Sequence, residues 1–156
     1  MRLLTSTLMA AAIALIAGVA QADTTAQGDA SATVIAPISV TAQDALQFGK
    51  LVSGGTDGTI TDGGTAAGGV TAVASTRSAG TFGVLGEANQ AYTPTVDPTA
   101  TLSNGPVNLT ADLTHTQAAN LSAGGTDTIT VHGTLHVPAN TAAGTYTGTY
   151  NVAVAY

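Results

Sequence analysis

The feature that most limits the fold of this chain is an alternation of apolar and polar side chains with a period of two residues. It is clearest in the last thirteen residues, 144–156 (GTYTGTYNVAVAY). Side chains alternate between the two faces of a β-strand, so one face of this segment carries Gly144, Tyr146, Gly148, Tyr150, Val152, Val154 and Tyr156. The pattern predicts one closing strand with an apolar face, an element to which another protein can bind by strand pairing.

The same alternation recurs along the chain between clusters of Gly, Asn, Asp and Pro. It predicts further strands over residues 30–42, 44–53, 69–75, 80–85, 92–96, 99–103, 107–115 and 126–137. No segment after residue 22 shows a useful apolar stripe at helical spacing. The sequence therefore predicts an all-β, antiparallel sandwich of the immunoglobulin-like or pilin-like kind. We expect about eight to ten strands in one domain, residues 30–156.

Gly and Pro indicate where the predicted strands are interrupted. Gly49 indicates a bulge between Phe48 and Leu51, and residues 57–64 (DGTITDGG) are typical of a tight hairpin tip. Pro37 predicts a break or an edge in the first strand, because proline has no N–H to donate to a neighbouring strand. Pro94 and Pro98 limit the strand over 92–96 to a sheet edge for the same reason.

The first 22 residues have the pattern of a secretory signal peptide. Arg2 supplies the positive start, residues 8–20 form a short apolar run, and Ala20-Gln21-Ala22 is a small-x-small cleavage site. An uncleaved membrane anchor is the alternative, but the apolar run is short for a span. We therefore expect export to the periplasm, the cell surface or an extracellular fibre, with a mobile arm over residues 23–29.

Composition narrows the function classes. The chain has no Cys, so the expected fold rests on packing and strand pairing without disulfides. After residue 22 the only basic residues are Lys50 and Arg77, against nine acidic ones. This charge predicts neither a nucleic acid nor an anionic membrane as a partner, because phosphate binding needs clustered Lys and Arg. Low charge with abundant Gly, Ala, Thr and Val is typical of extracellular structural subunits.

Two patterns resemble metal sites, and neither fits one well. His132 and His136 share the polar face of a predicted strand, but four residues of strand separate their rings by about 13 Å. We interpret them as exposed histidines opposite the core-facing Ile129, Val131, Leu135 and Val137. Residues 54–64 (GGTDGTITDGG) resemble Gly- and Asp-rich calcium loops, but they match neither calcium-loop pattern. Turn chemistry explains this composition, so no metal and no cofactor are predicted.

No arrangement of residues indicates catalysis. Asp57 with Asp62, or Glu87 with another acid, could form a carboxylate pair for glycoside hydrolysis, but these acids lie in predicted turns. There is no nucleophile elbow, no phosphate loop and no Cys nucleophile. We therefore expect a non-enzymatic protein with no small-molecule substrate.

Several short motifs, in order, carry a family resemblance over about residue 30 to the end of the sequence. They are APISV at 36–40, LQFG at 46–49, AGTF at 79–82, GEAN at 86–89, GGTDT at 124–128, GTL at 133–135, VPAN at 137–140 and AGTYTG at 143–148. The chain resembles the secreted bacterial family of domains of unknown function numbered 4402 (DUF4402). That resemblance implies no activity.

The closing pattern is also similar to that of pilins of chaperone–usher fimbriae, whose last strand places a Gly and a Tyr twelve residues apart. Gly144 and Tyr156 have this spacing, although Tyr156 is last where those pilins place it second to last. The disulfide that many of them carry is absent. The resemblance implies a donor segment near the start of the domain, for which the candidates are Ala30, Ala32, Val34 and Ala36.

These observations favour a structural subunit of a surface fibre or pilus, assembled by β-strand complementation. Its expected partners are like subunits, a periplasmic chaperone and an outer-membrane usher. A secreted binding module is the main alternative, although the chain has no Trp to stack on a sugar. A small outer-membrane β-barrel is a further alternative, but two Phe and four Tyr are too few for two aromatic girdles. The sequence leaves open whether residues 30–42 pair with their own domain or with a neighbour.

Overall fold

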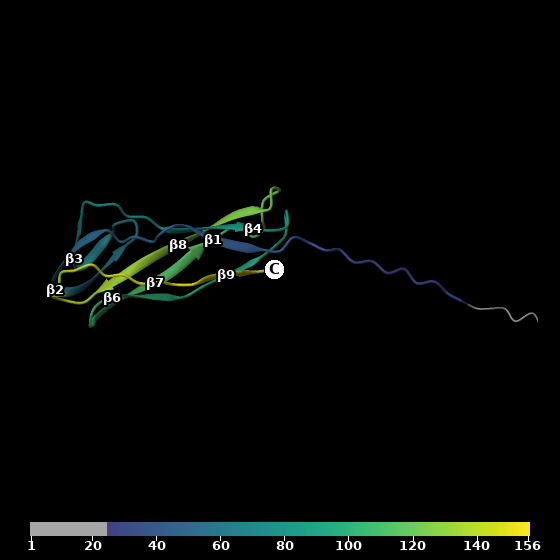
Figure 1. The fold of residues 1–156 in the computed structure, drawn as a ribbon. Helices are drawn as coiled ribbons and strands as arrows, with labels where there is room; N and C mark the ends of the chain where they lie inside the picture. The colour runs from purple at the N-terminus through teal and green to yellow at the C-terminus, as the bar shows by residue number, and fades with distance from the viewer. Residues whose placement is uncertain (1–24) are drawn as a thin grey trace, which may run out of the picture. The chain divides into compact units, whose positions relative to one another are not determined.

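The computed structural model describes residues 25–156, and the predicted signal peptide lies outside them. The chain divides into two units, residues up to Thr33 and the unit Val34–Tyr156 (Figure 1). Residues 25–33 are exposed and belong to no strand. No helix among the described residues is long and apolar enough to cross a membrane.

The unit Val34–Tyr156 is an antiparallel all-β fold, as the sequence predicts. Seven strands form one sheet, and β5 and β9 form a second, two-stranded one. The nine strands of the described chain fall within the predicted range of eight to ten. They are β1 (Ser39–Asp44), β2 (Lys50–Thr61), β3 (Ala66–Val73), β4 (Gly80–Leu85), β5 (Thr93–Val96), β6 (Thr99–Asn104), β7 (Val107–Thr116), β8 (Thr126–Val137) and β9 (Val152–Ala155).

Strand β8 is the centre of the larger sheet. On one edge it pairs with β4 through residues 126–131 and with β2 through residues 134–137. Its other edge pairs with β7 over residues 130–136. The outer strands then attach to these neighbours, β1 to β4, β3 to β2 and β6 to β7. Twelve residues of alternating pattern thus hold both halves of the sheet together.

The core lies on one face of this sheet. In β8 the predicted core-facing residues Ile129, Val131, Leu135 and Val137 are all buried, and His132 and His136 are exposed. Strand β7 alternates in the same way, with Leu109, Ala111 and Leu113 buried. Side chains of the last segment cover this core from the other side, namely Tyr146, Tyr150, Val152 and Val154. The predicted sandwich is therefore confirmed.

Several predicted strand boundaries are wrong. The first strand begins at Ser39 rather than at residue 30, because Pro37 interrupts the pattern and the preceding residues have no paired neighbour. Residues 44–53 are not one strand, since the chain turns at Gly49, whose φ is 68°. Strand β2 runs on to Thr61, so the hairpin tip lies at residues 62–65 rather than around Ile60.

The predicted closing strand is also shorter than expected. Only Val152–Ala155 forms a strand, and the preceding residues reach the sheet through an isolated bridge between Ser103 and Thr147. The backbone at Gly148 passes so close to the Thr101 carbonyl that a Cβ atom would collide with it. This close crossing interrupts regular pairing. The alternation itself is confirmed, because Tyr146, Tyr150, Val152 and Val154 are half-buried while their neighbours are exposed.

The central position of β8 makes its core side chains the most sensitive to truncation. Ile129→Ala removes a fully buried side chain, and we expect the free energy of unfolding to fall by about 2–4 kcal/mol. Thr128→Ala, one residue away on the exposed face, is the matched control and should change it by less than about 0.5 kcal/mol. Urea unfolding followed by circular dichroism measures both. Equal losses in the two variants would contradict this assignment of the faces.

A buried tyrosine predicts how stability depends on alkaline pH. Burial, together with a hydrogen bond to the Asp127 carboxylate, raises the pKa of the Tyr92 hydroxyl above its ordinary value. The folded state therefore keeps this proton where the unfolded chain loses it. Stability should be constant up to the unfolded tyrosine pKa of about 10 and fall as the pH rises further. Thermal unfolding between pH 8 and 11 tests this, and Tyr92→Phe should flatten the decline.

Candidate functional site

An apolar groove lies in the unit Val34–Tyr156. It encloses a cavity of about 810 Å³. One wall is the segment 46–53, and the other is the segment 141–146. The apolar side chains that line it are Leu46, Phe48, Leu51, Val52, Val73, Leu102, Leu109, Leu135 and Tyr146.

The groove continues along the last segment of the chain. A second cavity of about 180 Å³ is lined by Leu46, Phe48, Leu102 and Tyr146, which also line the first. It extends the hollow past Gly148 to Tyr150. Tyr150 packs edge-on against Phe82, with ring centroids 5.8 Å apart and planes at 71°. The two cavities therefore share part of their lining and both lie against the last segment of the chain.

Both walls of the groove have backbone without a strand partner. Residues 50–53 of β2 pair with β3 on one edge, but β2 meets β8 only from Gly58 onward. In the opposite wall, residues 143–146 make no backbone–backbone hydrogen bond among the described residues. Unpaired N–H and C=O groups along a strand edge are a template for another strand. The groove therefore offers both apolar contact and backbone pairing.

The groove is closed at one end by hydrogen bonds between its walls. Thr141 donates its N–H to Ser53 Oγ at 3.1 Å, and Ser53 Oγ donates to the Pro138 carbonyl at 3.0 Å. Asn140 N–H donates to the Gly54 carbonyl at 2.8 Å, and Ala139 N–H to the Asp57 carboxylate at 2.8 Å. These bonds join the two segments at this end of the groove and so fix the distance between them. The Asp57 carboxylate thus has a structural role.

Arg77 holds the wall that carries Phe48. Its guanidinium donates to the carbonyls of Phe48 at 3.0 Å, Lys50 at 2.8 Å and Val73 at 2.7 Å. The wall needs Gly49, because a Cβ there would lie 2.8 Å from Arg77 Cγ and the φ of 68° disfavours other residues. In the sequence Arg77 is one of two basic residues after residue 22, and this role was not predicted. The one available signal was its position among small and apolar residues (VASTRSAG, 73–80), with no acidic residue nearby to pair with the guanidinium.

A glycine in β8 admits the aromatic ring of this wall to the sheet. A Cβ at Gly133 would lie 2.7 Å from Phe48 Cζ and 3.0 Å from Leu46 Cδ2. His132 and Gly133 separate the part of β8 that pairs with β4 from the part that pairs with β2. The ring of Phe48 therefore rests directly on the backbone of the central strand, and only 7% of this residue is exposed.

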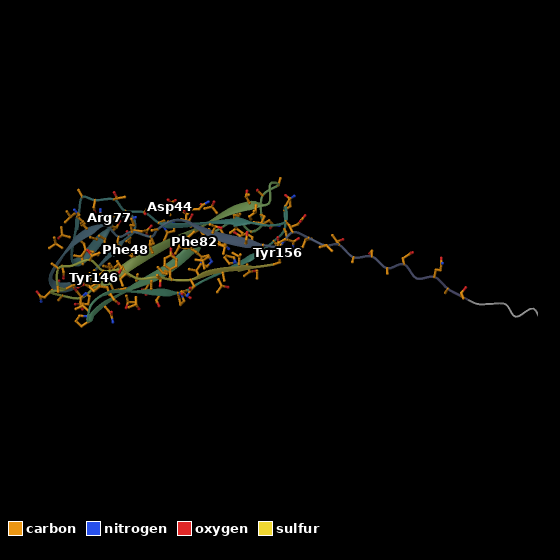
Figure 2. All side chains as sticks on the ribbon, viewed as in Figure 1. Asp44, Phe48, Arg77, Phe82, Tyr146 and Tyr156 are labelled. Carbon is orange, nitrogen blue, oxygen red and sulfur yellow. The ribbon has the colours of Figure 1, made fainter. Side chains whose placement is uncertain are left out.

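The residues predicted to bind partners in the last segment lie in different settings. Tyr146 and Tyr150 line the groove, and Gly144 lies against the Asn104 side chain. Val152 and Val154 belong to β9, opposite Val96 and Pro94 of β5. Tyr156 is 44% exposed. Figure 2 shows Tyr156 at one end of the unit and Tyr146 with Phe48 at the other.

The predicted donor residues belong to no strand. Ala30 and Ala32 are exposed, and Val34 is 96% exposed. The Ala36 N–H donates to the Glu87 carboxylate at 3.0 Å, and the Ala36 carbonyl accepts from the Tyr156 hydroxyl at 2.9 Å. Neither Val34 nor Ala36 lines the groove of its own unit.

The histidines of β8 each contact a different carboxylate. His132 Nδ1 lies 2.9 Å from Asp62 Oδ2, and His136 Nε2 lies 2.8 Å from Asp112 Oδ2. Asp62 also accepts the Gly133 N–H at 3.2 Å. Among residues 25–156 no group of three or more His, Cys, Asp or Glu side chains lies close enough to hold a metal ion.

Comparison with known proteins gives one match. The family described as "Domain of unknown function (DUF4402)" matches residues 38–156, which is the greater part of the chain. No curated protein and no solved structure matches significantly.

The Arg77 guanidinium holds the carbonyls of Phe48, Lys50 and Val73, which line the groove. Arg77→Met should therefore lower the free energy of unfolding by roughly 2 kcal/mol or more. Lys50→Met is the matched control, since it removes the same charge from an exposed side chain in the same wall. It should change stability by less than about 0.5 kcal/mol. Urea unfolding of both variants tests this. If only net charge mattered, the free energy of unfolding would fall equally in the two variants.

Proposed function

Since the chain belongs to the DUF4402 family, whose description names no activity, we propose its function from the groove and from the segment before β1. The protein is a structural subunit of a bacterial surface fibre, and residues 30–36 of one copy occupy the groove of the next. One observation carries the proposal. An apolar groove with unpaired backbone on both walls occurs in a chain that also has an exposed, unpaired segment of alternating apolar residues.

The proposed segment fits the groove in length and chemistry. Seven residues in strand conformation span about 20 Å, and residues 50–53 of the groove wall offer an edge of β2 that does not pair with β8. Ala30, Ala32, Val34 and Ala36 share one face, so a donated strand presents three small side chains and one larger one to the apolar lining. Its backbone N–H and C=O groups pair with the wall edges. Burial of Val34, which is 96% exposed in the single chain, adds hydrophobic stabilisation.

A second copy is a better source of this segment than the same chain. Ala36 is held beside Glu87 and Tyr156, near the start of β8, where Leu85 pairs with Thr126. The floor of the groove includes Leu135, nine residues farther along β8, at a distance of about 30 Å. Residues 30–36 reach only about 20 Å from their attached end. A donor from another copy makes a head-to-tail contact, which propagates into a filament.

The remaining partners follow from the same mechanism. Export delivers a subunit with an empty apolar groove, which is prone to aggregate. A periplasmic chaperone would fill the groove and contact the last segment, including Tyr146, Tyr150, Val152 and Val154. An outer-membrane usher would then exchange the chaperone for the donor segment of the next subunit. We propose no enzymatic activity, no nucleic-acid partner and no small-molecule substrate.

The test uses the chain from residue 23 onward, examined by negative-stain electron microscopy and light scattering. We expect fibres, or monomers that are unstable alone. Val34→Asp in the donor and Tyr146→Asp in the groove should each reduce fibre mass at least tenfold. Leu85→Asp is the matched control, because Leu85 is equally apolar, 57% exposed and outside the groove.

Mixing the two inactive variants gives the sharpest result. The Val34→Asp chain keeps an intact groove, and the Tyr146→Asp chain keeps an intact donor. Together they should form a dimer of one chain of each kind and nothing longer. Stable monomers in every sample, with no dimer in the mixture, would refute the proposal and favour a secreted binding module.

A further inference from the structure

Three hydrogen bonds form a closed ring where the domain begins. The Glu87 N–H donates to the Tyr156 hydroxyl oxygen at 2.6 Å. The Tyr156 hydroxyl donates to the Ala36 carbonyl at 2.9 Å, and the Ala36 N–H donates to the Glu87 carboxylate at 3.0 Å. We call this ring the Tyr156 latch. It satisfies both backbone groups of Ala36 with partners that are 51 and 120 residues away in sequence.

The loop that supplies Glu87 is itself held in place. Gly86 donates its N–H to the Gly125 carbonyl at 2.8 Å, and Asn89 donates to the Ser122 carbonyl at 3.1 Å. Gly86 has no room for a side chain, because a Cβ would collide with the Tyr156 hydroxyl and lie 2.9 Å from Leu121 Cδ1. The tyrosine hydroxyl therefore sits in a place that the loop leaves open for it.

The chain after Ala36 is also restricted. Pro37 has a fixed φ, and Ile38 packs against the core. Strand β1 begins at Ser39 and pairs with β4 from its first residue. With the latch closed, Ala36 is the first residue whose backbone is held by the domain. With the latch open, the backbone is unrestrained up to Pro37, just before Ile38 and β1.

We infer that Tyr156 is a positioning residue, which fixes the point and direction in which the donor segment leaves the domain. This inference rests on the proposed function. Of the proposed donor segment, residues 30–35 then lie in the groove of the next copy, while Ala36 stays in the latch of its own domain. No free linker then separates consecutive domains, so the latch makes the joint between subunits stiff.

The fibre test compares the persistence length of filaments in electron micrographs. Tyr156→Phe keeps the ring and removes only the hydroxyl, so fibres should still form, with a persistence length at least twofold shorter. Glu87→Gln keeps an oxygen acceptor and the backbone N–H, so it should restore most of the stiffness that Glu87→Ala loses. Thr149→Val changes an exposed hydroxyl in the same segment and should have no effect. Equal persistence lengths in all variants overturn the inference.

Amide hydrogen exchange tests the latch without fibres. In the Val34→Asp background, which should stay monomeric, Tyr156→Phe should speed exchange at Ala36 and Glu87 about tenfold and leave Val131 unchanged. Unchanged exchange at Ala36 and Glu87 overturns the latch even if fibres form. Faster exchange at these residues, together with stable monomers of the unmutated chain and no dimer in the mixture of variants, leaves the latch standing and refutes the proposed function, and with it the stiff joint.

Discussion

The structure depends on the pairing of β8 with neighbours along both of its edges. Strands β4 and β2 share one edge, and β7 occupies the other. Gly133 lies on the core-facing side of β8 between Val131 and Leu135, and its missing side chain leaves room for Phe48 and Leu46, which a Cβ there would meet. The segment that carries Phe48 is one wall of the groove. The groove therefore depends on a glycine in the core-facing row of the central strand.

The elements that could be predicted are those whose pattern is local. Strands β4 and β8 have the bounds that their alternation predicts, and the buried and exposed faces of β8 are correct to the residue. The parity of the last segment was also predictable, because burial follows the period of two wherever the chain lies on a core. Family membership was equally readable, since its motifs are spread along the whole domain.

What could not be predicted depends on contacts between distant segments. The glycines of β2 look like turn residues, yet Gly58 lies where the backbone of β3 comes close, and a Cβ there would collide with the Ala67 carbonyl. A glycine required by a neighbouring strand cannot be told from a glycine required by a turn in one sequence. The groove was missed for the same reason, because its walls are about 95 residues apart. Arg77 and the Tyr156 latch likewise join residues that no local pattern connects.

The fixed guanidinium of Arg77 has a consequence for proteolysis. Digestive enzymes of the trypsin type cut only after Lys or Arg, and beyond residue 24 the sequence offers them just Lys50 and Arg77. Cleavage needs a backbone that can detach and enter the protease, which a paired or pinned segment resists. Lys50 opens a strand that pairs with β3, and the Arg77 side chain is already engaged by three carbonyls. With so few sites of this kind, and with both of them fastened, the described part of the chain should resist proteases of the trypsin type.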